Sequence, residues 1–75
     1  MKSAQERKLL KKFGNHLAQL RKKRNLTQQE LAERVNMSVV SIAYLETGKR
    51  WTRIDTLRKL ARALKTSISE LFKDL

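Results

Sequence analysis

Apolar residues recur along this chain at spacings of three and four, and no stretch alternates apolar and polar residues over the length of a strand. The first apolar stripe predicts a helix that runs to about Lys23, and it consists of Leu9 or Leu10, Phe13, Leu17 and Leu20. Ser3 and Glu6 have the spacing of a capping box at its start. Gly14 costs roughly 1 kcal/mol inside a helix, so a start near Gly14 is the alternative.

A short second helix follows Asn25, which is a plausible end for the first. Thr27 and Glu30 have capping-box spacing, and the residues after them place three apolar side chains on one face, namely Leu31, Ala32 and Val35. Asn36 then suits the left-handed backbone conformation that ends a helix. We therefore expect a helix of about two turns and a tight turn after it.

A third helix is predicted from Val39 to about Thr47, with Ser38 as its cap and Gly48 after its end. Met37 is expected to fill the turn before it from the inside. Helical spacing places Ser41, Ile42 and Leu45 on the inward face. The outward face then consists of Val39, Val40, Ala43, Tyr44 and Thr47.

Two further helices complete an all-α chain of five helices in one domain, residues 1–75. Thr52 with Asp55 is expected to cap the fourth, whose apolar face is Ile54, Leu57, Leu60, Ala61 and Leu64. Ser67 with Glu70 is expected to cap the last, which carries Ile68, Leu71, Phe72 and Leu75.

The outward face of the third helix has no Lys, Arg, Asp or Glu, although one-third of the chain is charged. A helix face in water is ordinarily charged. Small, methyl-bearing and weakly polar side chains suit the major groove of DNA, where they meet thymine methyls and base edges. The alternative is that this face packs on another protein.

Composition points to the same class of partner. Eighteen Lys and Arg against seven Asp and Glu give a formal net charge of +11, which favours a polyanion such as nucleic acid or an acidic membrane surface. Because the predicted caps and turns interrupt the chain, it lacks the continuous amphipathic helix of a membrane-surface peptide. RNA is disfavoured because its deep major groove excludes a helix.

The chain has no cysteine, so no disulfide adds to a core that is marginal at 75 residues, and a second copy is the expected source of further burial. We expect a cytoplasmic protein with no membrane span or signal peptide. His16 is the single histidine, so no metal site is expected. No catalytic set or phosphate-binding loop is present, and we expect neither an enzyme nor a cofactor nor a small-molecule ligand.

The run from Leu20 to Ala32, LRKKRNLTQQELA, and the later LETGKR from Leu45 to Arg50 resemble the Cro, lambda-repressor and Xre-type helix-turn-helix family. The likeness covers about residues 13–72. It implies a five-helix fold, binding to palindromic DNA as a symmetric dimer, and control of transcription. Standalone members of this size include phage or plasmid repressors and controller proteins of restriction-modification systems.

The resemblance also implies roles for single residues. Gln28 matches the position that holds a backbone phosphate, and Arg21 with Glu46 matches a pair that links the first and third helices and steers the arginine toward phosphate. Asn36 stands where the family usually has glycine. Val39 and Val40 stand where many members carry Gln, Arg or Asn, so the base preferences of those members do not transfer.

We accordingly predict a segment of about 38–47 that lies in the major groove. The expected base contacts are Ser38, Val39, Val40, Ala43 and Tyr44. The expected phosphate contacts are Arg21, Gln28, Thr47, Lys49, Arg50 and Arg53. The dimer seam is expected in the fourth and fifth helices, at Ile54, Leu57 and Leu71; the alternative is that these side chains belong only to the core. Trp51 is expected to pack over the fourth helix, and its alternatives are to shield the dimer seam or to contact the DNA backbone. The alternative function is an antitoxin-like module that binds another protein through the same fold.

Overall fold

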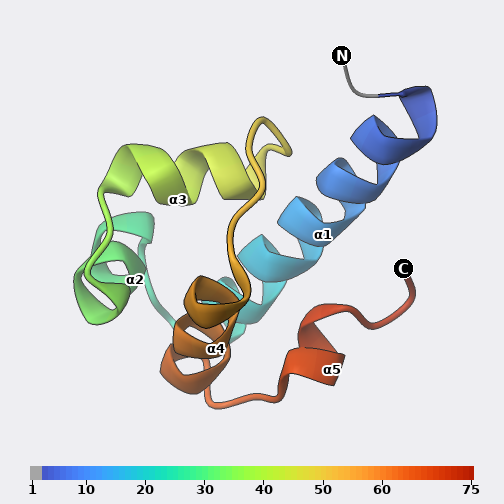
Figure 1. Ribbon diagram of the computed structural model, residues 1–75. Helices are drawn as coiled ribbons and strands as arrows, with labels where there is room; N and C mark the ends of the chain where they lie inside the picture. Colours follow the sequence, from blue (N-terminus) through green and yellow to red (C-terminus); the bar gives the residue numbers. More distant parts are fainter. Residues whose placement is uncertain (1–2) are drawn as a thin grey trace.

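The protein is all-helical over residues 3–75, the part of the chain that this computed structural model describes (Figure 1). Five helices follow one another with short connections: α1 (Ala4–Lys23), α2 (Gln28–Val35), α3 (Val39–Glu46), α4 (Ile54–Ala63) and α5 (Ile68–Leu71). The predicted fold class is confirmed. None of these described helices is long and apolar enough to cross a membrane.

Helix α1 runs without interruption through Gly14. Its cap is Ser3, whose hydroxyl accepts a hydrogen bond from the backbone N–H of Glu6 at 3.1 Å. A Cβ atom at Gly14 would collide with the backbone carbonyl oxygens of Leu45 and Glu46. The alternative start near Gly14 is therefore wrong, and the glycine is there because α3 ends directly against α1.

Three helices end on a non-glycine residue in the left-handed region: Asn25 with φ 57°, Asn36 with φ 56° and Lys65 with φ 54°. In each case the next residue donates its backbone N–H to the carbonyl five positions earlier, in the pairs Leu26–Arg21, Met37–Ala32 and Thr66–Ala61. These bonds satisfy carbonyl groups that a helix end leaves open. Both asparagine predictions are confirmed, and Met37 packs against the core as expected.

The start of α4 differs from the sequence prediction. Arg53 is the residue at the cap position, and no side chain accepts a hydrogen bond there. Thr52 lies one residue too early to cap the helix. Asp55 instead accepts the N–H of Thr56 at 3.0 Å and pairs with Arg53 at 3.2 Å. Helix α4 is held by its buried apolar face rather than by a cap.

The core takes apolar side chains from all five helices and from the connections before α2 and after α4: Phe13, Leu17, Leu26, Leu31, Ala32, Val35, Ile42, Leu45, Leu57, Leu60, Ala61, Leu64 and Leu71. Two of these residues, Leu57 and Leu71, were expected at the dimer seam, and their burial contradicts that prediction. Leu57 is 3% and Leu71 is 0% exposed, so neither side chain is available to a second copy. Ile54 is 62% exposed and stays a prediction for that seam.

Candidate nucleic-acid interface

Helix α3 is packed on one face and open on the other. Ile42 and Leu45 are buried against the rest of the protein, which α3 contacts through α1 and α2. Val39 and Val40 on the other face are 37% and 53% exposed. Figure 1 shows α3 at one edge of the molecule, with no helix on its outer side. The expected outward face is therefore free of the protein's own helices.

The open face of α3 carries no charge. Glu46 is the single charged residue within α3, and it is buried. Ala43 and Tyr44 are half-buried, and Ser38 is exposed at the start of the helix. The Ser38 hydroxyl accepts the N–H of Ser41 at 3.1 Å and donates to the Ser41 hydroxyl at 2.9 Å. The cap role of Ser38 is confirmed, and in this arrangement its oxygen can meet a base as an acceptor.

The buried carboxylate of Glu46 joins three helices. Arg21 of α1 donates to its two oxygens, from Nε at 2.7 Å and from Nη2 at 3.1 Å. Gln28 of α2 donates to the same carboxylate from Nε2 at 2.9 Å. The pair that the family resemblance implied is present, and it ties the start of α2 to the end of α3.

This network gives Arg21 a structural role. Its Nη1 donates to the carbonyl of Leu26 at 2.6 Å, so all three guanidinium nitrogens have partners within the protein, and the side chain is 10% exposed. Arg21 is therefore a positioning residue with little exposed surface, and its contact with a phosphate stays a prediction. Gln28 remains half-buried at the first position of α2, where the first backbone N–H groups of a helix have no intrahelical acceptor.

Cationic side chains line the end of α3. The backbone N–H groups of Lys49 and Arg50 donate to the carbonyl of Tyr44 at 2.8 and 3.3 Å. The Arg50 guanidinium lies 4.9 Å and the Lys49 ammonium 5.8 Å from the centroid of the Tyr44 ring, within reach of a cation–π contact. Tyr44 thus holds two cations beside the uncharged face of α3.

Two other expected phosphate contacts have partners of their own. The Thr47 hydroxyl donates to the carbonyl of Ala43 at 2.8 Å, so its hydrogen is not available to a phosphate in this arrangement. Arg53 pairs with Asp55, but its side chain is 85% exposed and stays accessible. An exposed pair of this kind contributes little, so it yields readily to a phosphate.

Comparison with known proteins identifies the family. A helix-turn-helix family model matches residues 17–71, which are most of the chain and contain the α2–turn–α3 unit just described. This chain belongs to the helix-turn-helix family of transcription regulators. The control protein C.MunI of Mycoplasma sp. is 35% identical over 65 residues, which are 85% of this chain and 88% of that protein.

One solved structure and a second relative by sequence agree with the assignment. The restriction-modification controller protein C.AhdI of Aeromonas hydrophila superposes with a TM-score of 0.82 at 35% identity, over 84% of this chain and 96% of that one. The transcriptional repressor RghR of Bacillus subtilis is 40% identical over 57 residues, which are 75% of this chain and 42% of RghR. These relatives are named as control proteins or as regulators of transcription.

The structure also reveals a contact that sequence spacing did not indicate. Trp51 packs on two other aromatic side chains: its ring centroid lies 5.0 Å from that of Phe13 on α1 and 6.0 Å from that of Phe72 after α5. These residues are too far apart in the sequence for periodicity to bring them together. His16 bonds the carbonyl of Glu70 through Nε2 at 2.6 Å, and no metal-binding group occurs within residues 3–75.

Proposed function

We propose that this regulator binds a palindromic operator in double-stranded DNA as a homodimer, with α3 of each copy in a major groove. The observation that carries the proposal is the uncharged, open face of α3 in a protein of net charge +11. A helix face that points into water is ordinarily charged. A face that meets base edges and thymine methyls in the major groove needs no charged side chains.

The proposed base contacts are Ser38, Val39, Val40, Ala43 and Tyr44. Because this set offers no side chain of the kind that pairs bidentately with guanine or adenine, we infer that the valines favour thymine-bearing steps through methyl contact. Tyr44 also carries a hydroxyl, which can form a hydrogen bond with either a base edge or a phosphate.

The proposed phosphate contacts lie on both sides of α3. Gln28 and the first backbone N–H groups of α2 suit a phosphate on one side, because a helix N-terminus attracts anions. Lys49, Arg50 and Arg53 supply cations on the other side. Phosphate contacts of this kind fix the position of a protein on the duplex without selecting a sequence.

Selection of bound duplexes from a random pool, followed by footprinting, tests the proposal. We expect a symmetric site whose two halves are roughly one helical turn, about 10 base pairs, apart. We also expect conserved thymines opposite Val39 and Val40. Selection of an asymmetric site, or of contacts to G·C pairs alone opposite α3, would contradict it. Failure to enrich any duplex would favour a protein partner on α3.

A further inference from the structure

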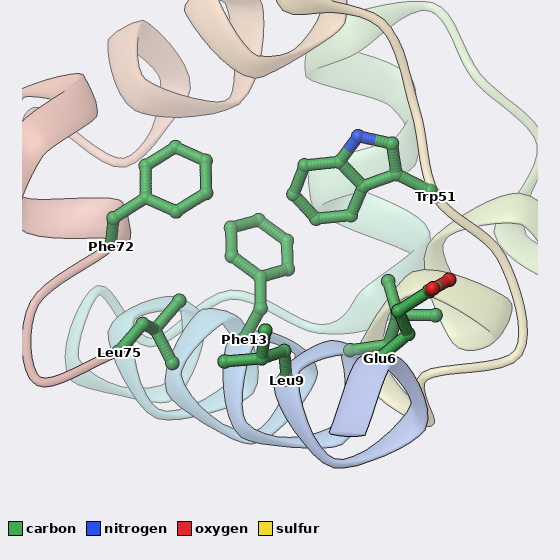
Figure 2. Close-up of a pocket in the computed structure, with 7 residues that line it drawn as sticks. Glu6, Leu9, Phe13, Trp51, Phe72 and Leu75 are labelled. Carbon is green, nitrogen blue, oxygen red and sulfur yellow. The ribbon is translucent and has the colours of Figure 1, made fainter. Parts of the chain in front are cut away.

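An apolar groove of about 520 Å³ lies between the N-terminal half of α1, the connection before α4 and the C-terminal segment. Figure 2 shows Phe13, Trp51 and Phe72 with their rings gathered around it, with Leu9 and Leu75 at its border. Leu9 is 50%, Trp51 45% and Leu75 41% exposed. Of the six large apolar side chains that are exposed within residues 3–75, three therefore lie on this one surface, which we call the aromatic groove.

The charge of the aromatic groove is unlike that of the rest of the protein. Its lining residues are Glu6, Leu9, Leu10, Phe13, Trp51, Phe72 and Leu75, and none of them is Lys or Arg. Two copies of a protein with net charge +11 repel each other wherever their basic surfaces meet. The lining of the groove brings no Lys or Arg of its own into a contact between two copies, and Glu6 at its border can pair with a cation from outside the groove of a second copy.

The position of the aromatic groove fits the spacing of a DNA-bound pair. In Figure 1 the N-terminal half of α1 and the C-terminal segment form one side of the molecule, whereas α2 and the start of α3 form the other. Successive major grooves on one face of DNA are about 34 Å apart, so each α3 must lie roughly 17 Å from a two-fold axis. The protein measures 31 × 24 × 21 Å, which accommodates that offset.

We propose that a second copy of this chain docks on the aromatic groove, and that Leu9, Trp51 and Leu75 form the centre of a two-fold interface. The proposal rests on the proposed function because that function requires a symmetric dimer. The choice of surface rests on the groove itself. In this proposal, exposed side chains form the dimer interface in place of Leu57 and Leu71, which are buried in the core. In a two-fold interface each of these residues occurs twice, so one substitution acts at two places.

The test compares Leu9→Glu with Gln19→Glu, an exposed position on the same helix that receives the same change of charge. Sedimentation equilibrium over a range of concentrations gives the dissociation constant of the dimer. We expect wild type and Gln19→Glu to be dimers of equal stability, and Leu9→Glu to raise the dissociation constant about 30-fold or more. Trp51 is the single tryptophan, so its emission should shift to longer wavelength on dilution of the wild type.

Leu75→Glu provides a second variant outside every helix, which weakens the dimer even if Leu9→Glu disturbs α1. A wild type that stays monomeric at high concentration would overturn the proposal, whether or not an apolar fluorescent probe then binds the groove. Unaltered dimerisation of both variants would overturn it as well.

Duplexes that carry one half-site separate this proposal from the proposed function. We expect Leu9→Glu to be monomeric and to bind a duplex with one half-site as wild type does. It should lose only the increase in affinity that a second half-site gives to wild type. A stable wild-type dimer with no affinity for duplex DNA would contradict the proposed function and leave the interface standing. A monomeric wild type that binds half-sites would contradict the interface alone.

Discussion

At the scale of single residues, Glu46 has the most consequence. Its buried carboxylate accepts hydrogen bonds from Arg21 and Gln28. It therefore forms an ion pair with a buried cation and orients the side chain of the first residue of α2. A buried ion pair costs the most when one partner is lost, because the other charge then stays in a poorly solvated place. The network therefore holds together α1, α2 and α3 and sets the position of Gln28.

Glu46→Gln should lower the free energy of unfolding by about 3 kcal/mol, because the Arg21 guanidinium then stays buried without a countercharge. Urea denaturation measures the change. Asp55→Asn is the control, since it breaks an exposed ion pair and should cost less than about 1 kcal/mol. Equal stability of the two variants would show that the buried pair does not stabilise the fold.

Gly14→Ala should destabilise the protein by about 1–3 kcal/mol, although alanine is the better helix former by roughly 1 kcal/mol. The reason is the collision of its Cβ with the carbonyl groups of Leu45 and Glu46, which must move away from α1. Thermal unfolding provides the measurement. Asn15→Ala, at the next and exposed position, should be neutral or slightly stabilising. A stabilised Gly14→Ala would contradict the close approach of α3 to α1.

At the scale of elements, the capping box of α2 is complete. The Thr27 hydroxyl accepts the N–H of Glu30 at 3.0 Å, and the Glu30 carboxylate accepts the N–H of Thr27 at 2.9 Å. The backbone hydrogen bond from Thr27, followed by the side-chain hydrogen bond with Thr27, lowers the pKa of Glu30. The box fixes where α2 begins, and hence where Gln28 stands.

The lowered pKa of Glu30 makes the cap sensitive to pH. The carboxylate stabilises the fold fully above the pKa of an unfolded glutamate, and this contribution is lost as the pH falls through the lower folded pKa. We therefore expect wild type to be more stable than Glu30→Gln near neutral pH and the difference to shrink on acidification. Urea denaturation at several pH values checks this, and a difference independent of pH would contradict it.

The elements were largely predictable because their signals are local. At Ser3, Thr27, Ser38 and Ser67 the capping side chain accepts a hydrogen bond from the backbone N–H three residues later. The start of α4 was not predictable, because packing of its apolar face rather than a cap sets it. Gly14 was ambiguous in the sequence, since its reason lies on α3, more than thirty residues away.

At the scale of the whole molecule, the distribution of charge and apolar surface decides function. The uncharged, open face of α3 followed from helical spacing, so it could be predicted. The burial of Arg21, Leu57 and Leu71 could not, because helical spacing does not tell which apolar or charged residues a core takes up. The aromatic groove also escaped prediction, since its rings come from segments that meet only in the folded chain.

Salt should weaken DNA binding in proportion to the cations that meet phosphate. With Arg21 engaged inside the protein, Lys49, Arg50 and Arg53 remain for each copy. Neutralisation of about six phosphates by a dimer predicts a slope of log K against log salt of roughly −5. Fluorescence anisotropy at several salt concentrations measures it. A flat response would contradict binding through the basic end of α3.

The most direct test of the central claim is the ratio of dissociation constants for a scrambled duplex and a selected duplex, measured for wild type, Val40→Ala and Arg50→Ala. We predict a ratio of about 10³ or more for wild type. Arg50→Ala should weaken both duplexes alike and preserve the ratio, whereas Val40→Ala should reduce the ratio or change the preferred sequence. A ratio near one for wild type, or one that Val40→Ala leaves unchanged, would contradict the placement of the open face of α3 against the bases.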